Sequence, residues 1–349
     1  MVGYFGGDRG QSKDVYDEVE LKDLPKMVDL RKEVNSILQK SSWWDLYGVD
    51  WVITFVVFGM VFVAVYLMSF DSALAVALGI LIYGYCHSSI TVKGAHAATH
   101  GSVCASTAWN RVWMILFSDI VGSFPSDATY DIHIKTHHPH TNIIGLGDSS
   151  TWKIPFLPTY AYMYVAPLFI PVITIPVSIS ELWGKWFKMI KYLVFTAIGL
   201  SINFYFLMNM SGFTFTHALL VTWVARAMLS IPYIHVNIFQ HIGLPMYSQK
   251  SRPVRIYQMS TGVLNLPRNL ILDYSFGHSI LSCHVEHHLF PTLSDNMCLK
   301  IQPTVSRFLK KNGLPYNEDT YQGRLEIFTK KYKELMVNAP PITHFVGIQ

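Results

Sequence analysis

Long apolar stretches separated by short polar segments dominate the chain and predict helices that cross a membrane. Residues 51–70 are twenty positions without a charged side chain, which is long enough to span the hydrocarbon core. A second apolar run begins at Ala73, and no strong helix breaker precedes His100. A helix over residues 73–100 would be about 42 Å long, against a hydrocarbon core of about 30 Å. We therefore expect its end to project beyond the membrane.

Two later runs, residues 192–210 and 213–234, also predict spanning helices and are joined by a tight turn. Arg226 lies inside the second of them, and we expect its side chain to snorkel towards the interface. Polar and charged side chains interrupt residues 103–124, which predict a helix at the interface or packed on the bundle. Residues 154–179 are apolar but contain five prolines, so they predict either a further span or a broken hairpin in the membrane surface.

The composition supports a membrane protein. Only 14% of the residues are charged and 51% are hydrophobic, with a mean hydropathy of +0.28, whereas soluble domains carry about 25% charged residues. The net charge of +4 comes without a dense basic run or a glycine-rich phosphate loop, so nucleic acid is not an expected partner. The four cysteines form no CxxC pair, which indicates reduced thiols facing the cytosol.

The charged ends suggest three parts. We expect a cytosolic N-terminal segment at 1–48, a membrane domain at 49–291 and a charged cytosolic cap at 292–349. An amphipathic helix is expected within the cap at about residues 321–336.

Histidines concentrate in three short boxes near the ends of the apolar runs. Their spacings of three and four residues place imidazoles on one face of a helix, and neutral imidazole is the commonest metal ligand in proteins. A further histidine, His241, lies between the second and third boxes. The boxes are His96 with His100, His133 with His137 and His138, and His284 with His287 and His288.

The position of these histidines limits the number of spans. Ligands of one metal centre must lie on one side of the membrane, and two spans between the second box and His241 satisfy this condition. We therefore interpret residues 154–179 as non-spanning. Lysines and arginines near the membrane ends indicate that the histidine side is cytosolic. The predicted fold is an all-α integral membrane protein with four transmembrane helices, both termini in the cytosol and a cytosolic helical cap that holds the histidine-rich site.

The number and type of candidate ligands indicate two iron ions. Nine histidine nitrogens are too many for one zinc ion, which takes four ligands. Soft thiolate ligands are absent, and so is the Glu-x-x-His pattern of soluble di-iron bundles. Iron can use dioxygen to remove hydrogen from an unactivated C–H bond, which no side chain can do. Because the boxes lie where helices leave the membrane, the expected substrate is a lipid acyl chain.

The boxes resemble those of the membrane fatty acid desaturases. The segment His137-His138-Pro139-His140-Thr141-Asn142 looks like the family's HHxxTN, and the segment from His284 to Pro291 looks like its HxxHHLFP. Residues 300–316 are similar to the segment that follows the third box in front-end desaturases. The resemblance covers roughly residues 50–320.

This resemblance implies a fatty acyl desaturase with two iron ions, O2 as co-substrate and an endoplasmic reticulum location. It adds Asn237 and His241 to the ligands, since they resemble the family's extra ligand segment, in which the asparagine acts through water. The implied metal site consists of His96, His100, His133, His137, His138, Asn237, His241, His284, His287 and His288.

Two departures from front-end desaturases bear on the activity. His284 stands where those enzymes usually have glutamine, so the class of double bond is unassigned, and a diverged member without a known activity fits equally well. No HPGG motif of a fused cytochrome b5 domain occurs. Electrons are therefore expected from separate proteins, cytochrome b5 and its reductase.

Three other functions remain open at this point. A lipid or fatty acid hydroxylase would use the same di-iron centre, and a catalytically silent relative would keep its ligands. A zinc-binding receptor or membrane metal transporter is disfavoured because the predicted spans contain no Asp or Glu and the boxes lie outside them.

Overall fold

The computed structural model describes residues 25–146 and 157–336, and these are mostly helical. Five helices are long and apolar enough to cross a membrane, so the chain is a multi-pass membrane protein. They are Trp44–Leu67, Ala73–Thr99, Ala161–Glu181, Trp186–Met210 and Phe215–Phe239.

Short π-helical or 3₁₀ turns, labelled η, divide these five helices. The first contains η2 (Trp44–Gly48) and α3 (Val49–Leu67), and the second contains α4 (Ala73–Ser88), η3 (Ser89–Gly94) and α5 (Ala95–Thr99). The third contains η6 (Ala161–Val165), η7 (Ala166–Phe169) and α9 (Ile170–Glu181). The last two contain α10 (Trp186–Tyr205) with η8 (Phe206–Met210), and α11 (Phe215–Ala227) with α12 (Ser230–Phe239).

The remaining elements connect these helices or cover the histidine boxes. Before the third long helix they are α2 (Met27–Gln39), α6 (Thr107–Met114), η4 (Ile115–Gly122), α7 (Ser126–Ile132), η5 (His133–His137) and α8 (His138–His140). After the fifth they are η9 (Gln249–Ser251), α13 (Arg255–Gly262), β1 (Leu264–Asn265), α14 (Leu270–Phe276), α15 (His284–Leu289), α16 (Asp295–Lys311), β2 (Asn317–Glu318) and α17 (Tyr321–Met336).

The helix Ala161–Glu181 falls in the proline-rich segment that we predicted not to span, whose residues 154–156 lie outside the described part. The prolines do not prevent a helix. Pro167 and Pro171 each occupy a first-turn position, of η7 and α9, where the missing N–H has no intrahelical partner to lose. Only Pro176 lies inside α9. Length and composition therefore allow a fifth span where the sequence favoured four.

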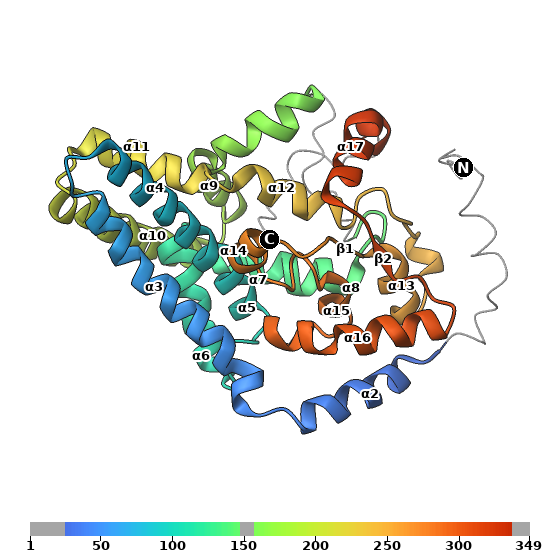
Figure 1. The fold of residues 1–349 in the computed structure, drawn as a ribbon. Coiled ribbons are helices and arrows are strands. Elements are labelled where there is room, and N and C mark those ends of the chain that lie inside the picture. Colours follow the sequence, from blue (N-terminus) through green and yellow to red (C-terminus); the bar gives the residue numbers. More distant parts are fainter. Residues whose placement is uncertain (1–24, 147–156, 337–349) are drawn as a thin grey trace.

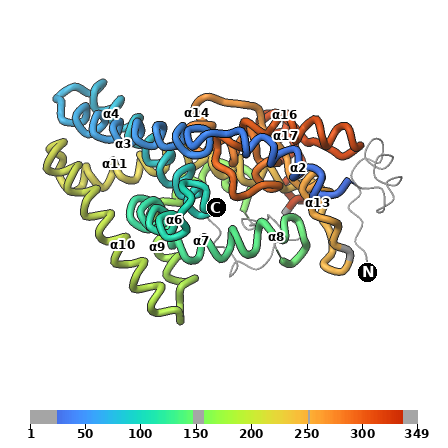
Figure 2. The backbone as a smooth tube through the Cα atoms, turned by 90° about the horizontal axis from the view of Figure 1, so that it is seen from below, coloured from blue at the N-terminus to red at the C-terminus, as the bar shows by residue number. Residues whose placement is uncertain are grey.

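The long helices gather on one side of the molecule and the covering helices on the other (Figure 1). α3 packs on α4, α4 on α11, and α10 on η4. A view turned by 90° shows the same division, with α2, α13, α16 and α17 at the end away from the α3–α4 pair (Figure 2). η4 lies in the bundle without being one of the long helices, as predicted for residues 103–124.

The close approach of α10 and η4 requires a glycine. A Cβ on Gly199 would lie 1.7 Å from the carbonyl oxygen of Ile120, so the helix backbones touch. Gly199→Ala is expected to lower the free energy of unfolding by about 1–3 kcal/mol, measured by titration with a denaturing detergent. Gly59→Ala is the matched control, because no atom lies within 4 Å of its Cβ. Equal effects of the two variants would contradict the contact.

Arg226 corrects one prediction. Its guanidinium does not extend to the interface but donates to the hydroxyl of Ser123 (3.0 Å) and the carbonyl of Val121 (3.2 Å). These groups lie at the C-terminal end of η4, where carbonyls have no helical partner. Arg226 therefore caps η4 within the bundle.

A second apolar core supports the third histidine box from outside. Val285 and Leu289 of α15 pack with Ile301 and Val305 of α16 and with α2. The parallel pair β1–β2, with Leu264 opposite Asn317, joins the segment before α15 to the chain after α16. Helix α17 extends from Tyr321 to Met336, as predicted. Together, α2, α16, α17 and the β1–β2 pair form what we call the cover. The cover places α15 against the other two boxes.

Candidate metal centre

The first histidine box lies at the end of the helix Ala73–Thr99. This helix has 27 residues and is about 40 Å long, which exceeds a hydrocarbon core of about 30 Å. His96 lies in α5 and His100 follows its last residue, and both side chains are buried. One long helix therefore ends in the first box and is longer than the hydrocarbon core is thick, as the sequence predicted.

The second box runs through η5 and α8 and ends in a tight turn at Asn142. This residue has a φ of 55°, in the left-handed region that asparagine tolerates better than most residues. Its side-chain amide donates to the carbonyls of His241, Pro245 and Gly262, each at 3.2 Å. The last residue of the HHxxTN segment thus fixes the second box to the His241 segment.

The third box occupies the short helix α15. Its spacing places His284, His287 and His288 on one face, opposite the face that Val285 and Leu289 bury in the cover. His241 lies just past the end of α12. Every one of these imidazoles is buried.

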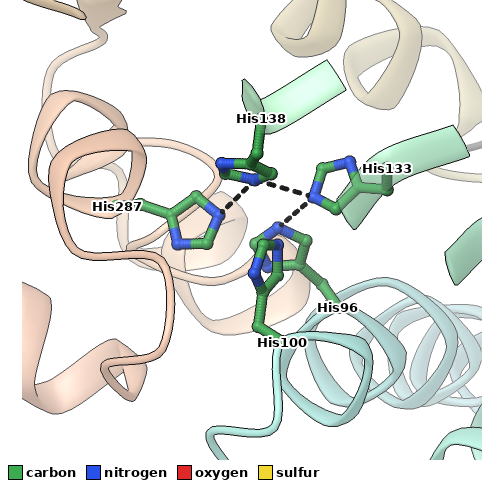
Figure 3. Close-up of side chains that lie close together, drawn as sticks. All are labelled: His96, His100, His133, His138 and His287. Atoms are coloured by element: carbon green, nitrogen blue, oxygen red, sulfur yellow. Dashed lines mark hydrogen bonds between the residues drawn. The ribbon is translucent and has the colours of Figure 1, made fainter. Parts of the chain in front are cut away.

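The three boxes and His241 converge on two adjacent groups of imidazoles. The ligand atoms of the first group lie within 4.8 Å of one another, and so do those of His137, His241 and His288. Figure 3 shows the first group, whose five rings come from three chain segments and face one volume. The Nε2 of His284 lies 2.8 Å from the Nε2 of His241, which adds His284 to the second group. The five-histidine group is His96, His100, His133, His138 and His287, and the four-histidine group is His137, His241, His284 and His288.

Hydrogen bonds to the Nδ1 atoms of the imidazoles, which we call the outer nitrogens, show which ring nitrogen keeps a free lone pair. The Nδ1 of His241 lies 3.2 Å from the carbonyl of Gly262, and the Nδ1 of His284 lies 2.8 Å from the carbonyl of Ser279. A carbonyl only accepts, so each Nδ1 carries the hydrogen and each neutral ring presents an Nε2 lone pair. These two lone pairs face each other at 2.8 Å, an arrangement that a metal ion bound by both rings would stabilise.

His288 follows the same pattern. Its Nδ1 lies 3.2 Å from the hydroxyl of Thr141, which donates its own hydrogen to the carbonyl of His137 at 2.9 Å. Thr141 therefore accepts from Nδ1, and the buried Nε2 of His288 has no hydrogen-bond partner among the described residues. A buried lone pair without a donor is costly unless a metal ion takes it. The donor set thus fits bound metal.

Burial keeps these imidazoles in the form that binds metal. It lowers the pKa of His100, His133 and His287 well below the ordinary value, and the neighbouring imidazoles lower it further. The same holds for His241 and His288 of the four-histidine group. Neutral imidazole is the ligand form, so the site can take up a metal ion without first releasing protons.

Asp131 and Glu286 lie close to ligand histidines in the sequence, but their carboxylates pair with other residues. Asp131 pairs with Lys135 and Lys188 near the surface. Glu286 is fully buried, and its carboxylate accepts hydrogen bonds from Asn265 (3.0 Å) and Tyr316 (2.7 Å). Burial raises the pKa of Glu286 to about 7, against these hydrogen bonds. Glu286 ties α15 to its cover.

The structure brings together the nine predicted histidines but places Asn237 differently. The amide of Asn237 donates to the carbonyl of Tyr233 at 2.8 Å, within its own helix. His140 contacts Arg252 at the surface, and His235 lies between Tyr321 and the carbonyl of Met163. Neither histidine belongs to the two groups.

Several supporting residues could not be found from the sequence. Ser279 contacts the outer nitrogens of two ligand histidines, and Gly262 and Thr141 contact one each. Arg255 donates to the carbonyl of His288 at 2.7 Å. None of these residues has a distinctive spacing. Thr141 alone carried a signal, as part of the HHxxTN segment.

Comparison with known proteins agrees with this site. The family model for fatty acid desaturase matches residues 71–320, which include all three boxes. The chain is 47% identical to fatty acid desaturase 6 of Bos taurus, over 92% of this chain and 94% of that protein. It is 45% identical to fatty acid desaturase 6 of Homo sapiens, over 92% and 90%. A Delta(5) fatty acid desaturase of Caenorhabditis elegans is 22% identical over 65% of this chain and 56% of its own length.

The match spans well over half of the chain, and its histidine boxes are the residues that build the two groups of imidazoles. The chain belongs to the fatty acid desaturase family.

Proposed function

We propose that the chain is a fatty acyl desaturase that introduces a double bond into a lipid acyl chain, using O2 and electrons from a separate donor. The observation that carries this proposal is the pair of buried imidazole groups whose Nε2 lone pairs face one another, as His241 and His284 do at 2.8 Å. Family membership indicates the class of reaction. The nitrogen donors of the site indicate that it binds metal.

Two iron ions are the metals that suit this site best. Nine nitrogen donors exceed what one ion takes. Imidazole suits iron as well as zinc, copper and nickel, and membership of the desaturase family favours iron among them. When bound, the irons supply the reduction of O2 and the oxidising power to remove hydrogen from an unactivated C–H bond. The ten predicted ligands, Asn237 through water among them, remain our proposed metal site.

The protein's own residues hold the imidazoles and exclude water. Carbonyls and hydroxyls fix the outer nitrogens. One apolar core around α12, α14 and α17 and another around α15 and α16 help to bury the site. A small cavity borders His96 and His133 and is also lined by Thr91, Ala95 and Phe124.

The site geometry also favours four spans. His138 and His241 lie in adjacent groups, so the chain between them must cross the membrane an even number of times. Three long helices lie in that interval, and the interrupted Ala161–Glu181 is the one we assign to the surface. The basic residues then place the boxes and both termini in the cytosol, with 1–48 and 292–349 as cytosolic parts around a membrane domain at 49–291.

The proposed location is the endoplasmic reticulum membrane. Cytochrome b5 and its reductase are the proposed electron donors, acting as separate proteins.

Metal analysis and product analysis test this function together. The purified full-length chain should contain about two irons, measured by elemental mass spectrometry. Cells that express it should accumulate lipids with two hydrogens fewer per acyl chain. Products with one added oxygen would identify a hydroxylase with the same centre. One zinc, or a folded chain without metal, would exclude the oxygenase mechanism and favour a receptor, a transporter or a silent relative.

A further inference from the structure

One residue contacts a ligand of each imidazole group. Ser279 lies in the loop Gly277–Cys283, between α14 and α15, which we call the Ser279 loop. Its hydroxyl lies 3.3 Å from the Nδ1 of His96, in the five-histidine group. Its carbonyl lies 2.8 Å from the Nδ1 of His284, in the four-histidine group. Both contacts are buried.

These contacts fix the tautomers of two ligands. The carbonyl can only accept, so His284 must carry its hydrogen on Nδ1 and direct its lone pair into the site. The hydroxyl can accept from His96 in the same way and so leave its Nε2 for metal. Partners of this kind orient the ring and raise its basicity as a ligand.

The Ser279 loop is held by a carboxylate at the start of α16. Asp295 accepts from the backbone N–H groups of His278 (3.0 Å) and Ser279 (2.9 Å). The approach requires Gly277, which has a φ of 103° and whose Cβ would lie 2.7 Å from the Asp295 carboxylate. Asp295 is itself buried, so it needs a positive partner.

The positive partner of Asp295 is Lys93, which lies on the helix that carries the first box. The ammonium of Lys93 contacts Asp295 and lies 2.9 Å from Asp50 of α3. Lys93 precedes His96 by three residues, which places both side chains on one side of the helix. The contacts therefore form a closed path from His96 through Ser279, Asp295 and Lys93 back to the helix that carries His96.

We propose that Ser279 is a positioning residue for both metal sites and that Asp295 holds it in place, which couples the start of α16 to the ligand geometry. This inference rests on the proposed function, because it concerns the two ions of the desaturase centre. It adds a residue through which one element of the cover acts on both sites.

The Ser279→Ala variant tests the two contacts separately. Alanine removes the hydroxyl at His96 but leaves the backbone carbonyl at His284. The five-histidine site should therefore lose iron at about ten-fold lower chelator concentration, while the four-histidine site should be unchanged. The Mössbauer spectrum of the full-length chain loaded with ⁵⁷Fe should show one altered iron environment and one unaltered.

Ser282→Ala is the matched control. Ser282 is buried in the same loop, but its hydroxyl bonds Asp273 at 2.7 Å and no metal ligand. It should retain both iron environments. A Ser279→Ala chain with unchanged chelator resistance and spectrum overturns the inference, and so does a Ser282→Ala chain that changes as much.

Asp295→Asn disturbs the loop from its other side and keeps the inference testable should Ser279→Ala fail to fold. It should weaken both sites, and unchanged iron binding would contradict the coupling. If the wild-type chain itself binds no iron, the proposed function fails. If the wild type binds two irons and the variants behave like it, only this inference fails.

Discussion

Replacing His287 and His288 together by alanine should remove both metal ions from the purified chain and lower its activity by at least about 100-fold. His287 belongs to the five-histidine group and His288 to the four-histidine group, so each site loses one nitrogen. Removing a residue that merely orients a ligand typically costs about 10–100-fold in metal affinity, and removing the ligand should cost more. Elemental mass spectrometry measures the metal, and lipid analysis measures the activity.

The single variants separate the two sites. His287→Ala should lower occupancy of the five-histidine site first, and His288→Ala that of the four-histidine site. His140→Ala is the control, because His140 lies in the same segment as the second box but contacts Arg252 at the surface. Full metal content in the double variant, or an equal loss in His140→Ala, would show that these imidazoles do not hold the metal.

The sequence could predict that the box histidines lie together because their spacing is local. Histidines three and four residues apart must share a helix face, and α15 presents His284, His287 and His288 together. The length of the apolar run after Ala73 likewise predicted one long helix that reaches the first box, and a 27-residue helix ends at Thr99, next to His100. Both predictions follow from helix geometry alone.

The supporting contacts could not be predicted because they join distant segments. Lys93 and Asp295 are 202 positions apart, and neither lies in a motif. Ser279 looks like an ordinary loop serine until the fold places its hydroxyl against His96. The direction of the Arg226 side chain could not be predicted for the same reason, because its carbonyl partner at Val121 lies 105 residues away in the sequence.

The number of spans shows a different limit. Proline content left residues 154–179 open between a further span and a broken hairpin. In the structure Pro167 and Pro171 fall at helix starts, where proline is favoured. Whether a proline is tolerated in a helix depends on its position relative to the helix start. Composition alone does not give that position. The positions of the histidines favour an even number of crossings between His138 and His241, which supports our proposal of four spans.

Lys93→Met should lower the free energy of unfolding by about 3–5 kcal/mol, because it leaves the carboxylates of Asp50 and Asp295 facing each other without their shared cation. Lys188→Met is the control. Lys188 pairs with Asp131 where both side chains are more than a third exposed, and such pairs contribute about 0–1 kcal/mol. Titration with a denaturing detergent gives both values.

The pH dependence of the Lys93→Met variant provides a second, independent check of this pair. Burial alone would raise the pKa of Asp295, but Lys93 and His278 hold it below its usual range. The wild-type stabilisation is therefore complete above the unfolded value of about 3.9 and declines only as the pH falls through the lower folded pKa.

Without Lys93 the burial effect remains, so Asp295 should take up a proton at mildly acidic pH. The variant should then regain part of its lost stability between about pH 8 and pH 5, while this pair causes no change in the wild type. A variant that is destabilised no more than Lys188→Met, or that loses further stability on acidification, would show that Lys93 does not neutralise the buried carboxylates.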